Sequence, residues 1–495
     1  MVDAAATAAA RDRSFFGHPR ALSTLFFVEM WERFSYYGMA AILVLYFTAG
    51  PSAGGAGLSV SQAAAAYALY TGLIYVVSLP GGWLADRLLG SKRSVLIGGG
   101  IIAVGHFVMA HGSLVAVGLG LAIIVVGTGF LKPNTATMVG DLYAADDPRR
   151  DSGFSIYYMS VNLGAFLAPF VTGYLAQAVS WQAGFAAAGV GMTLGLAHYL
   201  LDWRALGPLG AHARRPLAPD VERRYLGRAA VGLGAAVVAL ALVLVVLRVP
   251  VEALEQVVSW ALVVLPLGYF VVLLRADRPA VERHRLMALF ILFLATAAWF
   301  AVVSQAGSTL NVFAEDDTRR VLQRFTIPAP WFQSINPVCI LLFAPPLAWL
   351  WTHLDQRQPS TPAKFAMALL LVAASMGLMV AAARYAPTNG PATVLVSPLW
   401  LVAVFVVQTL GELLISPIGL SVATRLAPPQ SASQIMGVWM LSLAVGAALS
   451  GELANLYDRM SVQTYYMILG AIMLGTSLAI ALLRPTLLRL MEGVR

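Results

Sequence analysis

Long apolar runs separated by short polar segments constrain this chain more than any other feature of its sequence. A membrane-spanning helix needs about 20 consecutive, mostly apolar residues, and runs of this length recur from Ala21 onward. Of the 495 residues, 59% are hydrophobic and 11% are charged, whereas about 25% of the residues of a soluble domain are charged. The sequence therefore predicts an all-α polytopic membrane protein that lies in a lipid bilayer.

The runs fall into three groups. The predicted spans are 21–49, 60–84, 94–111, 113–139, 153–178 and 182–201, then 229–247 and 256–274, then 286–314, 330–352, 364–384, 394–424, 433–456 and 463–484. This order predicts about 14 transmembrane helices, arranged as two six-helix bundles with two extra helices in the linker. Each group of six has polar residues inside its spans, as in transporters built from repeats around a central cavity.

The same pattern divides the chain into five segments. They are the tail 1–20, the N-terminal bundle 21–202, the basic linker 203–285, the C-terminal bundle 286–485 and the tail 486–495. Arg87, Lys92 and Arg93 follow the second span, and Arg149 and Arg150 follow the fourth. Because basic loops stay in the cytoplasm, we expect both termini there. The net charge of +8 is explained by these loops, so we expect no nucleic acid partner.

The first span carries charged and phenolic side chains on one helix face. Glu29, Glu32, Arg33, Tyr36 and Tyr37 are spaced i, i+3, i+4, i+7 and i+8, which places them together on an α-helix. A charged side chain in a membrane span costs at least about 2.5–3.5 kcal/mol on insertion scales, so this face should line a polar cavity. The alternative is that these groups only pair with one another as a structural contact between helices.

Two further spans contain isolated charges. Lys132 precedes Pro133 in the fourth span, and Glu412 lies in an otherwise apolar run in the tenth. A buried carboxyl needs a cationic partner or a proton. An ion pair between Lys132 and Glu412 would join the two bundles, and protonation of Glu412 would break it. Alternatively, Lys132 extends toward the membrane interface.

Two asparagines and one loop complete the polar pattern. Asn162, and Asn336 beside Pro337, offer a donor and an acceptor suited to an amide substrate, or else bond a neighbouring helix. Asp86 and Arg87 belong to the segment GGWLADRLLGSKR, which resembles the cytoplasmic loop motif of the major facilitator superfamily. An ordinary basic inner loop is the alternative.

A membrane enzyme, for example a lipid-linked transferase, is the hypothesis from another class. It would require an acid cluster or a metal site, and the seven histidines show no ligand spacing. Cys339, the single cysteine, lies in an apolar stretch and is expected to be an inert core thiol. We therefore expect that the protein is not an enzyme and that it has no metal site.

Together these motifs resemble the proton-dependent oligopeptide transporter (POT/PTR) family of the major facilitator superfamily. Residues 29–37 match its first-helix motif E-x-x-E-R-F-x-Y-Y, and 157–164 match F-Y-x-x-I-N-x-G with Tyr157 for Phe and Val161 for Ile. Residues 411–417 match its tenth-helix pattern, and Trp439 lies where the eleventh helix has a binding aromatic residue. Bacterial members also carry two extra linker helices.

The resemblance implies roles for named residues. Proton coupling would involve Glu29, Glu32, Arg33, Lys132 and Glu412. Peptide binding would involve Arg33, Tyr36, Tyr37, Tyr75, Lys132, Asn162, Asn336, Glu412, Ser416 and Trp439. Within this set, Arg33 would attract the peptide carboxylate, and Glu412 would face the amino terminus.

The implied function is a proton-coupled symporter that imports di- and tripeptides by alternating access. The resemblance implies a monomer in the bacterial cytoplasmic membrane, with the proton as coupling ion and no other cofactor. The alternatives are transport of nitrate or of a peptide-like metabolite, or a peptide sensor that does not transport. Family members commonly have Glu before Gln305, where this chain has Ser304. Because serine does not titrate, we expect Glu32 and Glu412 to sense the proton in place of the missing Glu.

Overall fold

The computed structural model describes residues 12–144, 147–214, 216–217, 251–384, 395–427 and 432–493. Within these ranges, twelve helices are long and apolar enough to cross a membrane. A further long helix, α2 (Arg20–Thr48), carries the charged motif in its middle. The predicted all-α membrane protein is thereby confirmed. The predicted span 229–247, most of the tail 1–20 and the last two residues of the chain lie outside the described residues.

Six long helices precede the linker. They are α2, α3 (Val60–Leu84), α4 (Ser91–Met109), α5 (Leu114–Asp141), α6 (Arg150–Ala178) and α7 (Trp181–Leu201), with the short turns η1 (Pro51–Ala53) and η2 (Ala85–Leu89). Serine side chains fix several starting points. Ser59 and Gln62 form a reciprocal capping box at α3, and Ser113 and Ser180 cap α5 and α7. Each cap pairs a backbone N–H that the first turn leaves free.

The rest of the chain begins with the linker helix α9 (Val251–Arg275). It continues with α10 (Ala280–Val303), η4 (Ser304–Gly307), α11 (Thr309–Asp316), β1 (Val321–Leu322), β2 (Phe325–Thr326), η5 (Ala329–Ser334), α12 (Ile335–Leu354), η6 (Asp355–Arg357), α13 (Thr361–Ala383), α14 (Leu399–Leu426), α15 (Ala432–Ala454), η8 (Tyr457–Arg459) and α16 (Val462–Leu490). β1 and β2 pair as an antiparallel hairpin.

Several predicted boundaries differ from those in the structure. The span 286–314 is not one helix, because α10 ends at Val303 and the tight turn η4 separates it from α11. The buried Gln305 amide donates to the Oγ and carbonyl oxygen of Ser450 on α15, a contact that holds the turn. The helix expected at 394 begins at Leu399, after Pro398, since the residue before a proline avoids helical geometry. α16 extends to Leu490, past the predicted end at 484.

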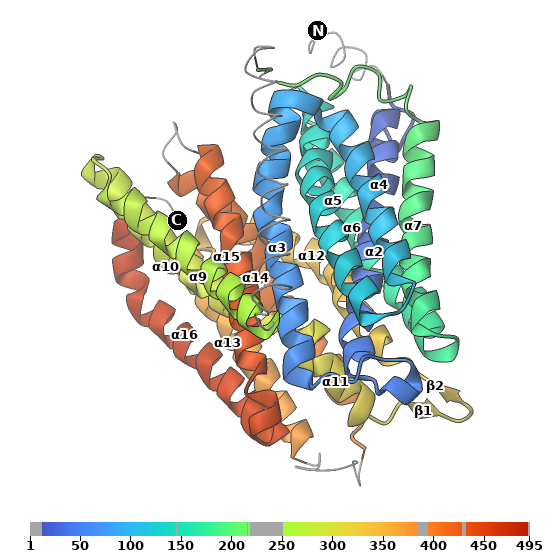
Figure 1. Ribbon diagram of the computed structural model, residues 1–495. Helices are drawn as coiled ribbons and strands as arrows, with labels where there is room; N and C mark the ends of the chain where they lie inside the picture. Colours follow the sequence, from blue (N-terminus) through green and yellow to red (C-terminus); the bar gives the residue numbers. More distant parts are fainter. Residues whose placement is uncertain are drawn as a thin grey trace.

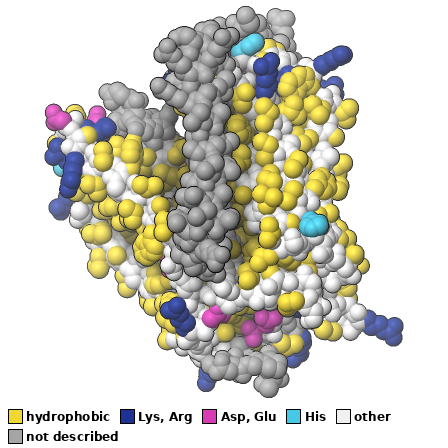
Figure 2. Space-filling model, viewed as in Figure 1, with side chains coloured by type: hydrophobic (Ala, Val, Ile, Leu, Met, Phe, Trp, Pro, Cys, Tyr) yellow, Lys and Arg dark blue, Asp and Glu magenta, His cyan; other side chains and the backbone are white. Residues whose placement is uncertain are grey.

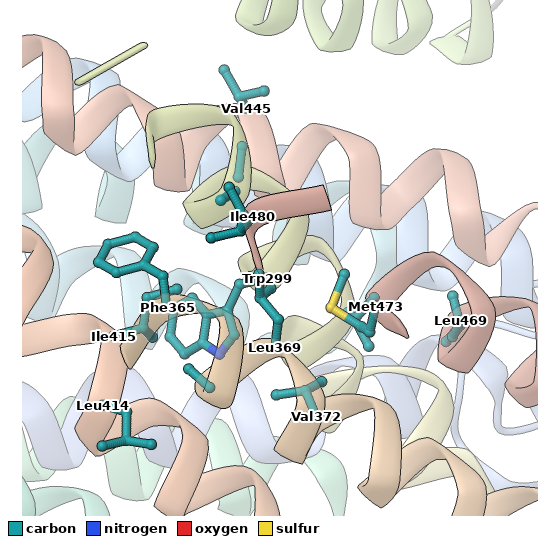
Figure 3. Close-up of a cluster of buried hydrophobic side chains, with 14 of the residues drawn as sticks. Trp299, Phe365, Leu369, Val372, Leu414, Ile415, Val445, Leu469, Met473 and Ile480 are labelled. Atoms are coloured by element: carbon teal, nitrogen blue, oxygen red, sulfur yellow. The ribbon is translucent and has the colours of Figure 1, made fainter. Parts of the chain in front are cut away.

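The two bundles lie side by side, with α2–α7 in blue to green and α10–α16 in yellow to red (Figure 1). Each bundle has its own apolar core. In the second core, Trp299, Phe365 and Leu369 meet Met473 and Ile480 from α16 (Figure 3). Hydrophobic side chains cover much of the outer face between two ends where charged residues gather (Figure 2). This distribution suits a bilayer, whose core excludes charge.

The linker helix α9 packs against the C-terminal bundle. Phe270 is fully buried and contacts Phe290 and Phe293 on α10 at ring distances of 5.1 and 4.9 Å. Leu262 of the same helix reaches Gly72 on α3, where an added Cβ would come within 2.9 Å of it. α9 therefore contacts both bundles.

The bundles also contact each other at the end that carries α11 and the β1–β2 hairpin, which we call the hairpin end (Figure 1). Asn311 Nδ2 donates to the carbonyl oxygen of Ala41 in α2 at 2.7 Å. Asp458 Oδ2 accepts from the backbone N–H of Ser61 at the start of α3, at 2.9 Å. The opposite end, where α2 begins and α5 ends, is called the N-terminal end (Figure 1).

Candidate functional site

The charged face of α2 is buried inside the protein. Arg33 Nε lies 3.0 Å from Glu29 Oε1 and 2.5 Å from Glu32 Oε2. The exposed fractions of Glu29, Glu32 and Arg33 are 3%, 1% and 7%. Removing one partner from such a buried group would leave an uncompensated charge, which costs about 3–5 kcal/mol. The three side chains therefore form one electrostatic unit.

α5 and α6 contribute hydroxyls to this unit. Thr135 Oγ1 donates to Glu29 Oε2 at 2.9 Å, and the hydroxyl of Tyr157 lies 2.9 Å from the same Thr135 oxygen. Because the threonine proton is used on the carboxylate, the tyrosine hydroxyl donates to threonine. Sequence reasoning missed Thr135. Its position three residues after Lys132, on the same helix face, was the available signal.

Lys132 does not pair with Glu412 in this structure. Its Nζ lies 4.2 Å from the ring centre of Tyr75 on α3, and the Arg33 guanidinium lies 5.6 Å from the ring of Tyr36. Both are cation–π contacts, which strengthen where water is excluded. The ammonium of Lys132 has no carboxylate within ion-pair distance among the described residues. The structure thus represents a state in which the predicted cross-bundle pair is open.

Glu412 is held within the C-terminal bundle. Asn336 Nδ2 donates to Glu412 Oε2 at 2.8 Å and lies 3.0 Å from the Oγ1 of Thr409. The helix break before Asn336 places its amide opposite α14. Asn162 is different, because its Nδ2 bonds the carbonyl oxygen of Tyr158 in its own helix. Asn336 therefore bonds a neighbouring helix, as one of the two sequence interpretations expected.

Aromatic side chains surround the charged groups. Tyr36 contacts Tyr37 at 5.0 Å and stacks on Tyr70 at 6.2 Å. Tyr75 meets Phe300 of α10 at 6.0 Å, and this contact joins the bundles. These rings offer apolar surface with hydroxyl groups at the edge.

Two predicted residues lie on α14 and α15. Trp439 is 4% exposed and packs on Gly419, where a Cβ would come within 2.6 Å of the indole. Ser416 is partly exposed, one turn after Glu412 on α14. The indole therefore sits against the same helix that carries the acid.

The predicted loop motif lies apart from this cluster. Asp86 and Arg87 are in η2, beyond the end of α3. Lys92, five residues further on, donates to the carbonyl oxygens of Trp203 and Gly207, both at 2.9 Å. The basic part of the motif thus fastens the start of α4 to the segment after α7.

Ser304 lies at the start of η4 and bonds only locally. Its Oγ donates to the carbonyl oxygen of Phe300 at 2.7 Å. Arg33 has Glu29 and Glu32 as its ion-pair partners among the described residues, and both belong to α2. Among the described residues, no carboxylate of the C-terminal bundle lies within ion-pair distance of Arg33.

The structure has two helical bundles that contact each other, and each bundle carries buried charged side chains. These features define a membrane carrier of the major facilitator fold. Residues 92–469 match the model of the POT family. A di-/tripeptide transporter of Lactococcus lactis subsp. cremoris is 36% identical over 98% of this chain and 99% of its own length. An uncharacterised transporter of Bacillus subtilis is 41% identical over 97% of both chains. The chain therefore belongs to the POT family.

Solved structures agree with this assignment. A crystal structure of a POT peptide transporter in complex with sulfate superposes with a TM-score of 0.93, at 39% identity and 100% coverage of both chains. A POT family transporter in complex with 5-aminolevulinic acid superposes with a TM-score of 0.89, at 34% identity over 96% of this chain and 98% of the other. The arrangement of the two bundles is thus shared with these transporters.

Proposed function

We propose that the protein is a proton-coupled symporter that takes up di- and tripeptides by alternating access. The observation that carries this proposal is the separation of opposite charges between the bundles. Arg33 and Lys132 belong to the N-terminal bundle, whereas Glu412 is held by Asn336 in the C-terminal bundle. A zwitterionic peptide needs one anchor of each sign, so it can bridge the two bundles.

Each group has a defined task in this mechanism. Arg33 and Lys132 attract the peptide carboxylate, and Glu412 receives the ammonium group. Asn162 and Asn336 bond the peptide main chain. The side-chain pockets are lined by Tyr36, Tyr37, Tyr75, Ser416 and Trp439.

The proton acts through the carboxyl groups. Glu29 and Glu32 share Arg33, so a proton on either weakens the hold on the guanidinium and frees it for the peptide. When Glu412 is ionised and no peptide is bound, its attraction for Lys132 draws the bundles together. A proton or a peptide ammonium on Glu412 ends that attraction. No cofactor other than the proton is required in this scheme.

The N-terminal end is the cytoplasmic end in this proposal. It carries Arg87, Lys92, Arg93, Arg149 and Arg150, as the positive-inside rule requires. Both termini then lie in the cytoplasm, and the hairpin end faces outward. The protein works as a monomer in the bacterial cytoplasmic membrane.

Uptake of labelled dialanine into proteoliposomes tests the function. We expect accumulation only with an imposed inward proton gradient, and loss of accumulation when a proton ionophore is added. Peptide exchange without gradient-driven accumulation would keep the substrate and reject the coupling. Binding without any flux would indicate a peptide sensor.

A peptide-like metabolite is the second candidate substrate. A relative at 34% identity binds 5-aminolevulinic acid, which also carries an amine and a carboxylate. Competition decides between the candidates. Dialanine should reduce its own labelled uptake more strongly than 5-aminolevulinic acid does, and nitrate should have no effect because it has no amine for Glu412.

A further inference from the structure

A second charged cavity lies at the hairpin end, apart from the residues assigned above. Its volume is about 640 Å³, which falls within the range of about 300–1,000 Å³ usual for small-molecule sites. Thr48, Gln177 and Trp181 line it from the N-terminal bundle. The lining residues on the other side are Glu315, Asp316, Arg320, Arg324, Phe325, Thr326 and Pro328. The cavity therefore lies between the bundles, and we call it the hairpin-end cavity.

The lining of this cavity combines both signs of charge with aromatic surface. Glu315 and Asp316 supply carboxylates, and Arg320 and Arg324 supply guanidinium groups. The rings in the wall come from Tyr174, Trp181 and Phe325. A ligand with one ammonium, one carboxylate and apolar side chains fits this combination, whereas an anion or a cation alone would meet like charge.

Three of these side chains form a network that fastens the bundles together. The guanidinium of Arg320 pairs with the carboxylate of Glu315 and donates to the carbonyl oxygen of Ile327 at 3.0 Å. Gln177 Nε2 on α6 donates to Glu315 Oε2 at 2.5 Å, and Arg320 Nη1 donates to Gln177 Oε1 at 3.4 Å. Gln177 belongs to one bundle and the ion pair to the other.

The ion pair is accessible from the cavity. The side chain of Glu315 is 33% exposed and that of Arg320 is 12% exposed. A ligand carboxylate can therefore bind Arg320 while the ligand ammonium binds Glu315. One ion pair is replaced by two, so neither protein charge is left alone. Gln177 loses its acceptor in this exchange, and the contact between the bundles weakens.

We infer that the hairpin-end cavity is an entry site for the transported peptide, where the peptide termini exchange with the Glu315–Arg320 pair. The inference rests on the proposed function, because the site takes the same substrate class from the outer side. Peptide bound there would favour opening of the hairpin end toward the central site. Peptides with blocked termini would lack both anchors.

Protection of a single cysteine tests the entry site. Thr48→Cys places a thiol in the cavity wall, Cys339→Ala removes the native thiol, and Glu412→Gln disables the central site. In right-side-out vesicles, dialanine should slow labelling by an impermeant maleimide about fivefold when about four-fifths of the sites are occupied. N-acetyl-dialanine amide should leave the labelling rate unchanged.

Two charge variants locate the effect. Arg320→Gln should abolish protection, whereas Arg319→Gln, a neighbouring arginine outside the cavity lining, should retain it. Equal protection by the blocked peptide would overturn the entry site, and this comparison needs no change at Arg320. Protection that appears only when Glu412 is intact would also overturn it, because the effect would then come from the central site.

Uptake of dialanine by the unaltered protein separates the two proposals. Uptake without protection of the cysteine rejects the entry site alone. Absence of both rejects the entry site together with peptide transport.

Discussion

At the scale of single residues, the charge balance around Arg33 distinguishes this chain. Both carboxylates that pair with Arg33 come from its own helix. Movement of one bundle against the other therefore leaves these two ion pairs intact. Family members commonly have a titratable acid at position 304, in the second bundle. This chain has serine there, and its hydroxyl donates to the carbonyl oxygen of Phe300.

Ser304→Glu should restore a carboxyl that opposes Arg33 from the second bundle. The added carboxyl group can bind a proton when it is not paired with Arg33, so the transport cycle gains one proton-binding step. We expect a steeper pH dependence of dialanine uptake and a higher ratio of protons to peptide, measured from the reversal potential in proteoliposomes. Ser304→Gln is the control of the same length without a charge. Identical ratios in the two variants would contradict this account.

Glu32→Gln should uncouple transport from the proton gradient. Arg33 keeps Glu29 as an ion-pair partner but loses the carboxylate of Glu32. We expect the initial rate of gradient-driven uptake to fall at least about tenfold, since removal of a partner from a buried charge costs several kcal/mol. Ser35→Ala is the control, because Ser35 lies on α2 and donates to a backbone oxygen. Full gradient-driven uptake by Glu32→Gln would argue against its coupling role.

Asp317, after the end of α11, should make the stability of the hairpin end depend on pH. Burial, with the nearby Asp316 carboxylate, raises the pKa of Asp317 from 3.8 to about 6. Because the folded protein binds this proton more tightly, the stabilising contribution is complete below about pH 4 and is lost as the pH rises through about 6.

Asp317→Asn should therefore stabilise the protein at pH 7.5, by about 1 kcal/mol after allowance for solvent screening. At pH 4 the gain should vanish. The thermal unfolding midpoint in detergent measures both cases, with the exposed Asp277→Asn as control. A gain of equal size at both pH values would show that ionisation is not the cause.

Sequence reasoning predicted the α2 cluster because helix spacing alone brings Glu29, Glu32 and Arg33 together. It predicted Lys132 as the partner of Glu412, whereas the structure pairs Glu412 with Asn336. That contact depends on how α12 packs against α14. Charge alone favours the lysine, and nothing in the local sequence specifies the distance between these helices.

At the scale of helices, the approach of α2 to α6 depends on Gly164. A Cβ at this position would lie 2.3 Å from the carbonyl oxygen of Met30 and 3.0 Å from the backbone nitrogen of Phe34. These are backbone atoms, so the clash is relieved only by separating the helices. Because α2 carries the charged cluster, this separation would also disturb the site.

Gly164→Ala should lower the thermal unfolding midpoint and reduce uptake. Overpacking of this kind costs about 1–3 kcal/mol. Gly118→Ala on α5 is the matched control, because no atom lies within 4 Å of its Cβ position, and alanine favours helix. Equal midpoints for the two variants would show that the helices can separate without cost.

Apolar run lengths predicted most helices to within a few residues. The break at η4 was missed because residues 286–314 read as one apolar run without proline. Its cause is the tertiary contact of Gln305 with Ser450. The β1–β2 hairpin was also missed, since its turn residue Gln323 adopts a φ of +57° that glutamine rarely adopts.

At the scale of the whole molecule, the bundles are fastened at the hairpin end by a few polar contacts. Asn311 reaches the Ala41 carbonyl, Asp458 reaches the Ser61 N–H, and Gln177 reaches Glu315. The neutral hydrogen bond of Asn311 contributes about 0.5–1.5 kcal/mol, and each bond to the carboxylates of Asp458 and Glu315 contributes about 1.5–3 kcal/mol. Contacts of this size hold one state while allowing rapid exchange with another.

Asn311→Ala should increase the population that is open at the hairpin end. Loss of a bond worth about 1 kcal/mol corresponds to about a fivefold shift. A cysteine at the buried Thr71, in a Cys339→Ala background, should react about five times faster with an impermeant maleimide. Thr352→Ala, an exposed hydroxyl bonded within α12, is the control. An unchanged reaction rate would show that this bond does not hold the hairpin end closed.

The serine at position 304 also bears on how far a cell could concentrate peptides. Each proton that crosses 100 mV with its cargo supplies about 2.3 kcal/mol, which corresponds to about a fiftyfold ratio of internal to external concentration. A carrier that moves one proton fewer per cycle therefore reaches an accumulation limit about fiftyfold lower per 100 mV. It also draws less current for each molecule taken up. Such a carrier suits a habitat where peptides are plentiful and membrane energy is scarce.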